Sequence, residues 1–263
     1  MKLTLDLRHE RLPVVFWLAL VALSIYVIIS QLPASWVSGS LGRQTTCRVM
    51  LEQPLGTIWQ GSAALAFSEP NATEGGCRDP LSVTERFHWA SSCQLLAMTC
   101  STEIQFGALD KPQRILWGID RALMSANEIN LPANVLEGLG NPWSTLRPRG
   151  ELNSRWTDLQ FGGSEGNSGV IRIIIKRLTS PISPVKPLGG YEILANLGKD
   201  GMNWLLSTTS GPLLLKGQGK SGQQGSGMHF SGEASASPEA QESLIGLLSL
   251  LGKKEGDVYR LKF

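Results

Sequence analysis

The chain has 263 residues, of which 42% are hydrophobic and 17% are charged. This composition excludes an intrinsically disordered protein, and the length suffices for one large domain or two small ones, each with its own core. The 24 lysines and arginines exceed the 22 acidic residues by only two. The sequence has no run of basic residues that could contact successive phosphates of a nucleic acid, so nucleic acid is excluded as an expected partner.

The N-terminal region predicts a membrane anchor. Residues 1–11 carry one lysine and two arginines, and the uncharged run LPVVFWLALVALSIYVIIS follows them. At about 1.5 Å per helical residue this run spans the hydrocarbon core of a bilayer. A cleaved signal peptide is the alternative, but its apolar region usually has only about 7–15 residues. Because the basic residues precede the run, we expect a cytoplasmic tail at 1–11, a transmembrane anchor at 12–32 and an exported domain at 33–263.

All four cysteines, Cys47, Cys77, Cys93 and Cys100, follow this predicted anchor. In a bacterial cell they would lie in the oxidising periplasm, so all four are candidates for disulfides. Four cysteines allow three pairings, and the turn-like stretch NATEGGC favours a bond from Cys77 to Cys93 or Cys100. Zinc is the alternative, but there is no C-x-x-C pair and His88 is the only histidine nearby, so we expect no metal.

The exported region predicts an antiparallel β-fold. Short segments that resemble strands are bounded by Gly, Asn, Ser or Pro: TIWQGSAALAF, ERFHWASS, CQLLAMTCSTEIQF, GELNSRWTDLQFGG, GVIRIIIKRLTS, NWLLSTTSGPLLLKGQG and GMHFSGEASAS. Their spacing favours an antiparallel sheet over βαβ units. The 29 glycines and 14 prolines fit the many turns that such a sheet requires.

Two helices are expected within this β-rich region. LPANVLEGLG, residues 131–140, is short and ends in glycine. SPEAQESLIGLLSLLG is the stronger candidate, with Ser237 as N-cap, Pro238 in the first turn and Gly252 as the terminating residue. Its apolar residues follow helical spacing, so one stripe is expected to pack on the sheet. A short helix in the membrane interface is the alternative.

Apparent catalytic motifs do not support an enzyme. GGSEG fits the G-x-S-x-G pattern around Ser164, but a strand rather than a helix is predicted to follow it. GQGKS lacks the first glycine of a phosphate loop, because Leu214 occupies that position. The histidines have no neighbouring carboxylate and nucleophile in the sequence. We expect no catalytic residue and no cofactor.

The stretch GTIWQGSAALAF has two glycines bracketing a tryptophan. Together with the tail from Gly217 to Phe263, it resembles the protein N family (GspN) of the bacterial type II, or general, secretion system. The matching positions in the motif are Gly56, Thr57, Trp59 and Gly61. The order of features is also similar to that of the family: a short cytoplasmic start, one anchor, the motif, a β-rich body and a last strand.

This resemblance implies a non-enzymatic accessory subunit of the inner membrane, single-pass, with the bulk of the chain in the periplasm. Its expected partners are other subunits of the inner-membrane platform, with the outer-membrane secretin as a further candidate. The fold it implies is mainly β, with a curved antiparallel sheet that is AsmA-like in outline. AsmA-like proteins are associated with envelope lipid handling, so a lipid-binding module is the alternative function.

The sequence suggests two roles for the Gly56–Gly61 motif. Gly56 and Gly61 would allow a turn or a close approach of backbones, and Trp59 would bury its ring against the sheet. This interpretation makes the motif part of the framework, and a surface for docking a partner is the alternative. The inner face of the sheet should separate the two functions, because a filled core favours an assembly subunit and an open apolar channel favours lipid handling.

Overall fold

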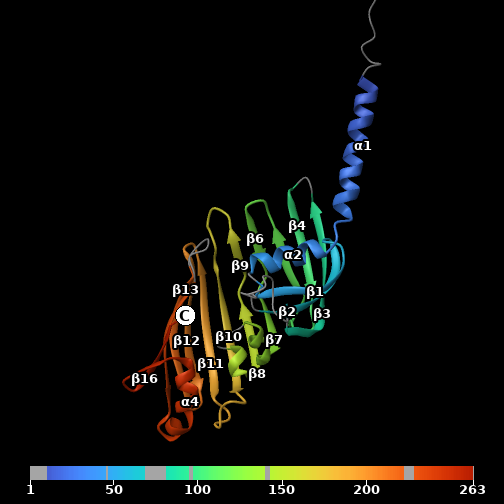
Figure 1. Cartoon of the computed structure of the whole chain (residues 1–263). Helices are drawn as coiled ribbons and strands as arrows, with labels where there is room; N and C mark the ends of the chain where they lie inside the picture. The colour runs from blue at the N-terminus through green and yellow to red at the C-terminus, as the bar shows by residue number, and fades with distance from the viewer. Residues whose placement is uncertain are drawn as a thin grey trace, which may run out of the picture.

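The computed structural model describes residues 11–45, 47–68, 81–94, 97–139, 143–221 and 228–262. Two antiparallel sheets and a few short helices make up the described chain (Figure 1). The prediction of a mainly β, antiparallel fold is therefore confirmed.

Two helices precede the sheets. Helix α1 (Arg11–Ser30) projects away from the body, and α2 (Ser35–Gln44), which the sequence did not predict, packs beside the first strand (Figure 1). Within the described part of the chain, no helix is both long and apolar enough to cross a membrane. The transmembrane anchor stays a prediction.

The smaller sheet has seven strands in the order β1-β2-β3-β4-β5-β6-β9. Its strands are β1 (Val49–Gly56), β2 (Gln60–Phe67), β3 (Leu81–Gln94), β4 (Thr99–Gln105), β5 (Gln113–Trp117), β6 (Arg121–Met124) and β9 (Leu159–Gly162). The sequence predicted that one strand ends at Ser92 and the next begins at Cys93. This boundary is wrong by two residues, because Cys93 and Gln94 still belong to β3 and pair with Cys100 and Thr99 of β4.

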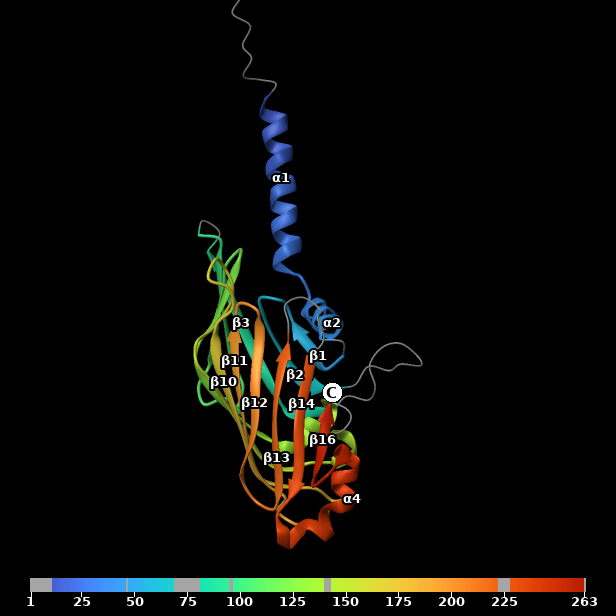
Figure 2. The same cartoon turned by 90° about the vertical axis from the view of Figure 1, so that its left-hand side faces the viewer.

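The larger sheet has nine strands in the order β15-β16-β14-β13-β12-β11-β10-β8-β7. Its strands are β7 (Asn127–Pro132), β8 (Arg149–Trp156), β10 (Gly169–Thr179), β11 (Gly189–Gly198), β12 (Gly201–Ser210), β13 (Leu213–Ser221), β14 (Met228–Ala236), β15 (Lys253–Glu255) and β16 (Val258–Lys262). Strands β10 to β14 are neighbours in chain order, as short connections between antiparallel strands require. These strands run side by side in Figure 2.

Two chain segments pass from one sheet to the other. β6 of the small sheet continues as β7 of the large one, and β8 of the large sheet continues as β9 of the small one. At this crossing the Ala126 N–H donates to Asp158 Oδ1 at 2.7 Å, and Trp156 Nε1 donates to the Ser125 carbonyl at 3.1 Å. The sheets therefore share a hydrogen-bonded joint.

The main hydrophobic core lies between the large sheet and the C-terminal helix. The predicted helix begins as a short 3-10 turn, Pro238–Ala240, and continues as α4 (Gln241–Leu251) before Gly252. Its Leu244, Leu247 and Leu248 are buried against the sheet, as the stripe predicted, so the interfacial alternative is wrong. The predicted helix at 131–140 is instead the 3-10 helix η1 (Ala133–Leu139), because β7 occupies the chain up to Pro132; the short α3 (Trp143–Leu146) follows.

Candidate functional site

The Gly56–Gly61 motif forms a tight turn between β1 and β2. The two glycines are register partners, and the Thr57 N–H donates to the Gln60 carbonyl at 2.9 Å. Thr57 Oγ1 accepts hydrogen bonds from the backbone N–H groups of Trp59 and Gln60, at 3.3 and 3.2 Å. Gly56 has φ +88°, and a Cβ there would lie 2.4 Å from the Gln60 carbonyl oxygen. A side chain at this position would therefore collide with the turn.

Gly61 makes room for a second tryptophan. It is the register partner of Trp89 on β3, and a Cβ on Gly61 would lie 2.5 Å from the Trp89 ring. The Trp89 Nε1–H is directed at the carbonyls of Thr57 and Ile58, both at 3.2 Å. The buried indole thus packs on glycine while its one donor is satisfied by the motif.

The same turn contacts the C-terminal end of α1. Trp59 Nε1 donates to the Ile29 carbonyl at 2.8 Å, and the Ile58 N–H donates to the Leu32 carbonyl at 2.9 Å. The Ile29 carbonyl belongs to the last turn of the helix, where carbonyls lack a partner within the helix. The motif therefore lies between the helix and the sheet, and it binds to both.

The cysteines pair differently from the expectation. Cys93 and Cys100 form a disulfide across the β3–β4 hairpin, where they are register partners. The expected bond from Cys77 to either of them is wrong, because the hairpin register brings Cys93 and Cys100 face to face. Cys47 is also disulfide-bonded, and Cys77 lies outside the described residues.

The residues considered for catalysis are spread over the molecule. Ser164 lies in the turn between β9 and β10, so a strand follows it, as predicted. His88 belongs to β3 and His229 to β14. Among the residues that the structure describes, no group of three or more His, Cys, Asp or Glu side chains is arranged to hold a metal ion.

The inner face of the large sheet contains an apolar cavity of about 530 Å³. Strands β10 to β14 and β16 line it, and Leu247 and Leu251 of α4 close one side. Its lining includes Ile175, Ile193, Trp204, Leu206, Leu215 and Phe230. The polar lining residues include Arg48, Thr179 and Ser180. An apolar cavity of this size matches ligand pockets, which commonly measure about 300–1,000 Å³.

Strand alternation builds this cavity. In β10, Ile173 and Ile175 belong to the core side, whereas Arg172 and Lys176 are on the opposite face. Deep in the core, the Tyr191 hydroxyl donates to the Leu213 carbonyl at 3.0 Å, and burial raises the pKa of this phenol. The alternating pattern was visible in the sequence, but it does not reveal which inward side chains leave space between them.

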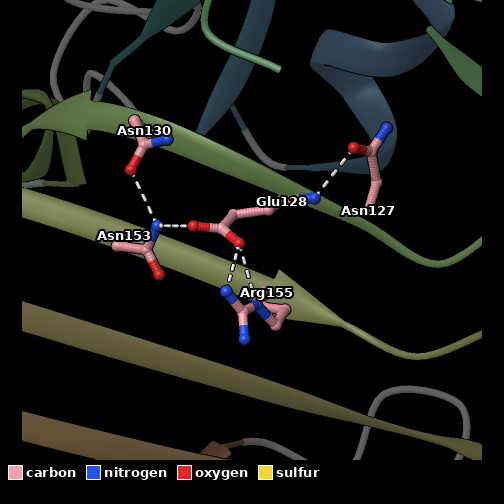
Figure 3. A network of polar contacts seen from close by, with 5 residues as sticks. All are labelled: Asn127, Glu128, Asn130, Asn153 and Arg155. Atoms are coloured by element: carbon pink, nitrogen blue, oxygen red, sulfur yellow. Dashed lines mark hydrogen bonds and ion pairs between the residues drawn. The ribbon is translucent and has the colours of Figure 1, made fainter. Parts of the chain in front are cut away.

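The outer face of the large sheet carries a charged network (Figure 3). Glu128 accepts hydrogen bonds from Asn153 at 2.5 Å and from two nitrogens of Arg155 at 2.6 and 2.8 Å. Asn153 also donates to Asn130 at 2.7 Å. The Asn153 hydrogen bond, followed by that of Arg155, holds the pKa of Glu128 below its usual value. Such exposed networks add little stability.

Two of the sheet edges, β15 and β1, are poorly suited to adding a strand from a partner. β15 at one edge of the large sheet has only three residues, Lys253, Lys254 and Glu255, all exposed. β1 at an edge of the small sheet has an irregular register between Glu52 and Leu55, and α2 lies beside it. Short, charged or bulged strands are common means of blocking edges.

The comparison with protein families identifies the chain. A family model described as "Type II secretion system (T2SS), protein N" matches residues 48–262. No curated protein and no solved structure matches the chain. The matched residues cover both sheets, α4 and the Gly56–Gly61 motif. The resemblance noted in the sequence is therefore confirmed, and the chain belongs to the protein N family of the type II secretion system.

Proposed function

We propose that this protein is a non-enzymatic accessory subunit of the type II secretion system, held in the inner membrane with its sheets in the periplasm. Membership in the family carries this proposal and implies other secretion subunits as partners. In this role the protein supports the export of folded proteins across the outer membrane through protein–protein contacts. The platform subunits and the secretin are the partners to test.

The membrane attachment in this proposal is through α1. The uncharged run of the sequence begins at Leu12 and continues to Gly42, whereas side chains of α1 are described only from Val14 onward. Every large apolar side chain from Val14 to Ile29 is 42–66% exposed. Because a bilayer removes such a surface from water, it favours insertion of α1. The Gly56–Gly61 motif then transmits the position of the anchor to the sheets.

The outer face of the large sheet is the proposed docking surface. It presents ion pairs with exposed cationic partners, Arg155–Glu128, Arg172–Glu192 and Lys216–Glu233. Charges arranged in this way select partners by complementarity more than they add affinity. The opposite face is apolar and partly covered by α4.

In-cell photocrosslinking tests the assembly role. A photoreactive residue replaces Arg172 on the outer face, or Gln241 on the exposed side of α4, and mass spectrometry identifies the adducts. Ile173, the neighbour of Arg172 on the core side, is the matched control. We expect adducts with secretion subunits from position 172 and fewer from position 173. Phospholipid adducts without any secretion subunit would contradict the assembly role.

The apolar cavity favours a second candidate function, the binding of one acyl chain of an envelope lipid. A cavity of about 530 Å³ with a mainly apolar lining leaves dispersion contacts unmade unless something apolar fills it. The acyl chain would lie along Ile193, Leu206 and Leu215, with its polar end toward Arg48. The cavity supports lipid handling because it leaves apolar space on the inner face of the sheet.

Adjacent residues of β12 test lipid binding. Leu206 lines the cavity, whereas Leu205 is 55% exposed and is not among the cavity residues. Leu206→Trp fills the cavity and should abolish binding of a fluorescent fatty acid to the delipidated full-length protein, while Leu205→Trp should leave it unchanged. Equal binding by both variants, or none by the wild type, would exclude the cavity as a lipid site.

A further inference from the structure

Two hairpin ends of the small sheet expose apolar side chains. Met98, at the β3–β4 hairpin, is 65% exposed, and Ile119, between β5 and β6, is 81% exposed. Trp117, at the end of β5, is 47% exposed. Large apolar side chains so exposed, and so close together in the fold, need an explanation.

The strand register brings these side chains to one end of the sheet. Cys100, two residues after Met98, pairs with Trp117 on β5, and Trp117 pairs with Ala122 on β6. The Cys93–Cys100 disulfide links the two strands of the β3–β4 hairpin at this end. We call the group of Met98, Trp117 and Ile119 the apolar tips.

The apolar tips lie at the end of the body from which α1 rises. In Figures 1 and 2 the ends of β3 and β4 extend in the direction of α1 and reach the level of its lower turns. In Figure 1 the hairpin ends recede from that level toward the C-terminal strands. The strands that reach furthest along the anchor are thus those that end in apolar residues.

The β3–β4 hairpin end is also free of charge. No charged residue occurs from Trp89 to Thr102, a stretch that contains the whole β3–β4 hairpin end. The turn between β9 and β10 carries Glu165, and the turn between β11 and β12 carries Lys199 and Asp200. The β5–β6 turn keeps one acidic residue, Asp120, directly after the exposed Ile119, so its tip is apolar only at Trp117 and Ile119.

We propose that the apolar tips insert into the headgroup layer of the bilayer that α1 spans. This inference rests on the proposed anchoring of α1. Tryptophan prefers the boundary between headgroups and acyl chains, and methionine and isoleucine gain from leaving water. Asp120 directly follows Ile119, so insertion stops at the polar layer and does not reach the hydrocarbon centre.

Shallow insertion gives the body a second point of attachment. The first is the hydrogen-bonded contact between α1 and the Gly56–Gly61 motif. A body held at two points keeps one orientation relative to the membrane plane. The charged outer face of the large sheet is then presented at a constant angle to partner subunits.

Spin-label accessibility in the full-length protein tests this proposal. A nitroxide is attached through an encoded non-natural residue, which leaves the cysteines intact, at position 98, 119, 18 or 250 in separate samples. The protein is reconstituted into phosphatidylethanolamine–phosphatidylglycerol bilayers. Collision rates with oxygen and with a water-soluble nickel chelate then report the depth of each label. Leu250 is the matched control, because it is 61% exposed and belongs to α4, which lies at the end of the body far from α1 (Figure 2).

We expect the nickel collision rate at positions 98 and 119 to be several-fold lower than at position 250 but higher than at position 18. Ile119→Lys should raise the nickel collision rate of a label at 98, while Leu250→Lys should leave it unchanged. Suppose that the nickel collision rates at positions 98 and 119 equal the rate at position 250 while position 18 is protected. This result would refute insertion of the apolar tips but leave the anchoring of α1 intact, and it would favour a protein partner for the tips. An aqueous position 18 would overturn both the anchor and the tips.

Discussion

The two sheets of this protein are stabilised by different means. Among the residues that the structure describes, the large sheet, η1 and α4 share a core of 14 buried residues, whereas the second cluster has four: Leu51, Ala63 and Trp89 of the small sheet, and Ala34 just before α2. The small sheet relies instead on a disulfide and on indole hydrogen bonds to backbone carbonyls. Burial stabilises the part that carries the cavity, and directed bonds stabilise the part attached to α1.

Both sheets contain a glycine that faces a tryptophan on a neighbouring strand, but the two tryptophans differ in burial. Gly61 faces Trp89 in the small sheet, and Gly219 faces Trp204 in the large one, each pair in direct register. A Cβ on either glycine would lie within 2.5 Å of the facing ring. Trp89 is buried with its N–H bonded, whereas Trp204 is half-buried and lines the cavity. The pairing of glycine with tryptophan is therefore a building element, and the surroundings decide what it does.

Truncating the main core should have the largest effect. Leu244 of α4 is fully buried, so Leu244→Ala should lower the free energy of unfolding by about 2–5 kcal/mol. Urea denaturation of the full-length protein in mild detergent measures this change. If the sheets are stabilised separately, near-ultraviolet signals from the small sheet should persist beyond the transition of the large one.

Leu250 provides the matched control for this prediction. It lies on the same helix but is 61% exposed, so Leu250→Ala should change the free energy of unfolding by less than about 0.5 kcal/mol. Because alanine favours the helix at least as well as leucine, similar losses for both variants would contradict core packing by the buried side of α4 as the source of the effect. Loss of both sheets in a single transition would show that the joint at Asp158 couples them.

Removing the Cys93–Cys100 disulfide should have the next largest effect, and in the other sheet. The double substitution Cys93→Ser, Cys100→Ser frees the β3–β4 hairpin end and should destabilise it by about 2 kcal/mol, since the bond closes a short loop. Hydrogen exchange measured by mass spectrometry should show faster exchange in β3 and β4 and little change in β12 and β13. Uniformly faster exchange would contradict separate stabilisation.

The β-fold and the C-terminal helix were accessible from sequence because their signals are local. Residues 237–252 combine a proline in the first turn, helical spacing and a terminal glycine, and the structure has the helix there. The strands followed from alternation bounded by turn residues. Helix α2 was missed because its sequence, SWVSGSLGRQ, is rich in serine and glycine, which favour helices weakly.

Pairings between distant residues were not accessible in the same way. The turn-like NATEGGC suggested a bond to Cys77, whereas the Cys93–Cys100 bond depends on the exact register of a hairpin. The hydrogen bond from Trp59 to Ile29 joins residues 30 positions apart. The cavity needs six neighbouring strands and α4 to be placed before its space exists. Spacing within one segment carries none of this information.

The contact between α1 and the small sheet should respond to a smaller change. Trp59→Phe keeps an aromatic ring but removes the N–H that donates to the Ile29 carbonyl. Loss of one hydrogen bond should cost about 1 kcal/mol, localised at the contact. Spin labels on α1 and on β3 should show a broader distance distribution in this variant.

Trp36→Phe is the control for the α1 contact. Trp36 lies on α2 with 66% of its surface exposed, so its substitution should leave the distance distribution narrow. A distribution that stays narrow in Trp59→Phe would show that the remaining backbone bonds, such as the one from Ile58 to Leu32, suffice to fix α1. The motif would then act as framework through its glycines rather than through its tryptophan.

The smallest effect concerns the outer face of the large sheet. Hydrogen bonds from Asn153 and Arg155 lower the pKa of Glu128 below its ordinary value of 4.5. A carboxyl group with a lowered folded-state pKa stabilises the protein above its unfolded pKa, and this contribution is lost as the pH falls through the lower, folded value. Glu128→Gln should therefore flatten the decline of unfolding free energy below pH 4.5.

Asn153→Ala separates the two causes of the Glu128 shift. The Asn153 hydrogen bond is the larger one, so its loss should move the pKa of Glu128 upward while Arg155 still holds it below 4.5. A carboxyl-carbon NMR titration measures this shift, with Asn203→Ala, on the exposed face of β12, as the control. An unchanged Glu128 titration in Asn153→Ala would mean that Arg155 alone sets it. The outer face would then depend on ion pairs, unlike the small sheet, where single directed hydrogen bonds determine the geometry.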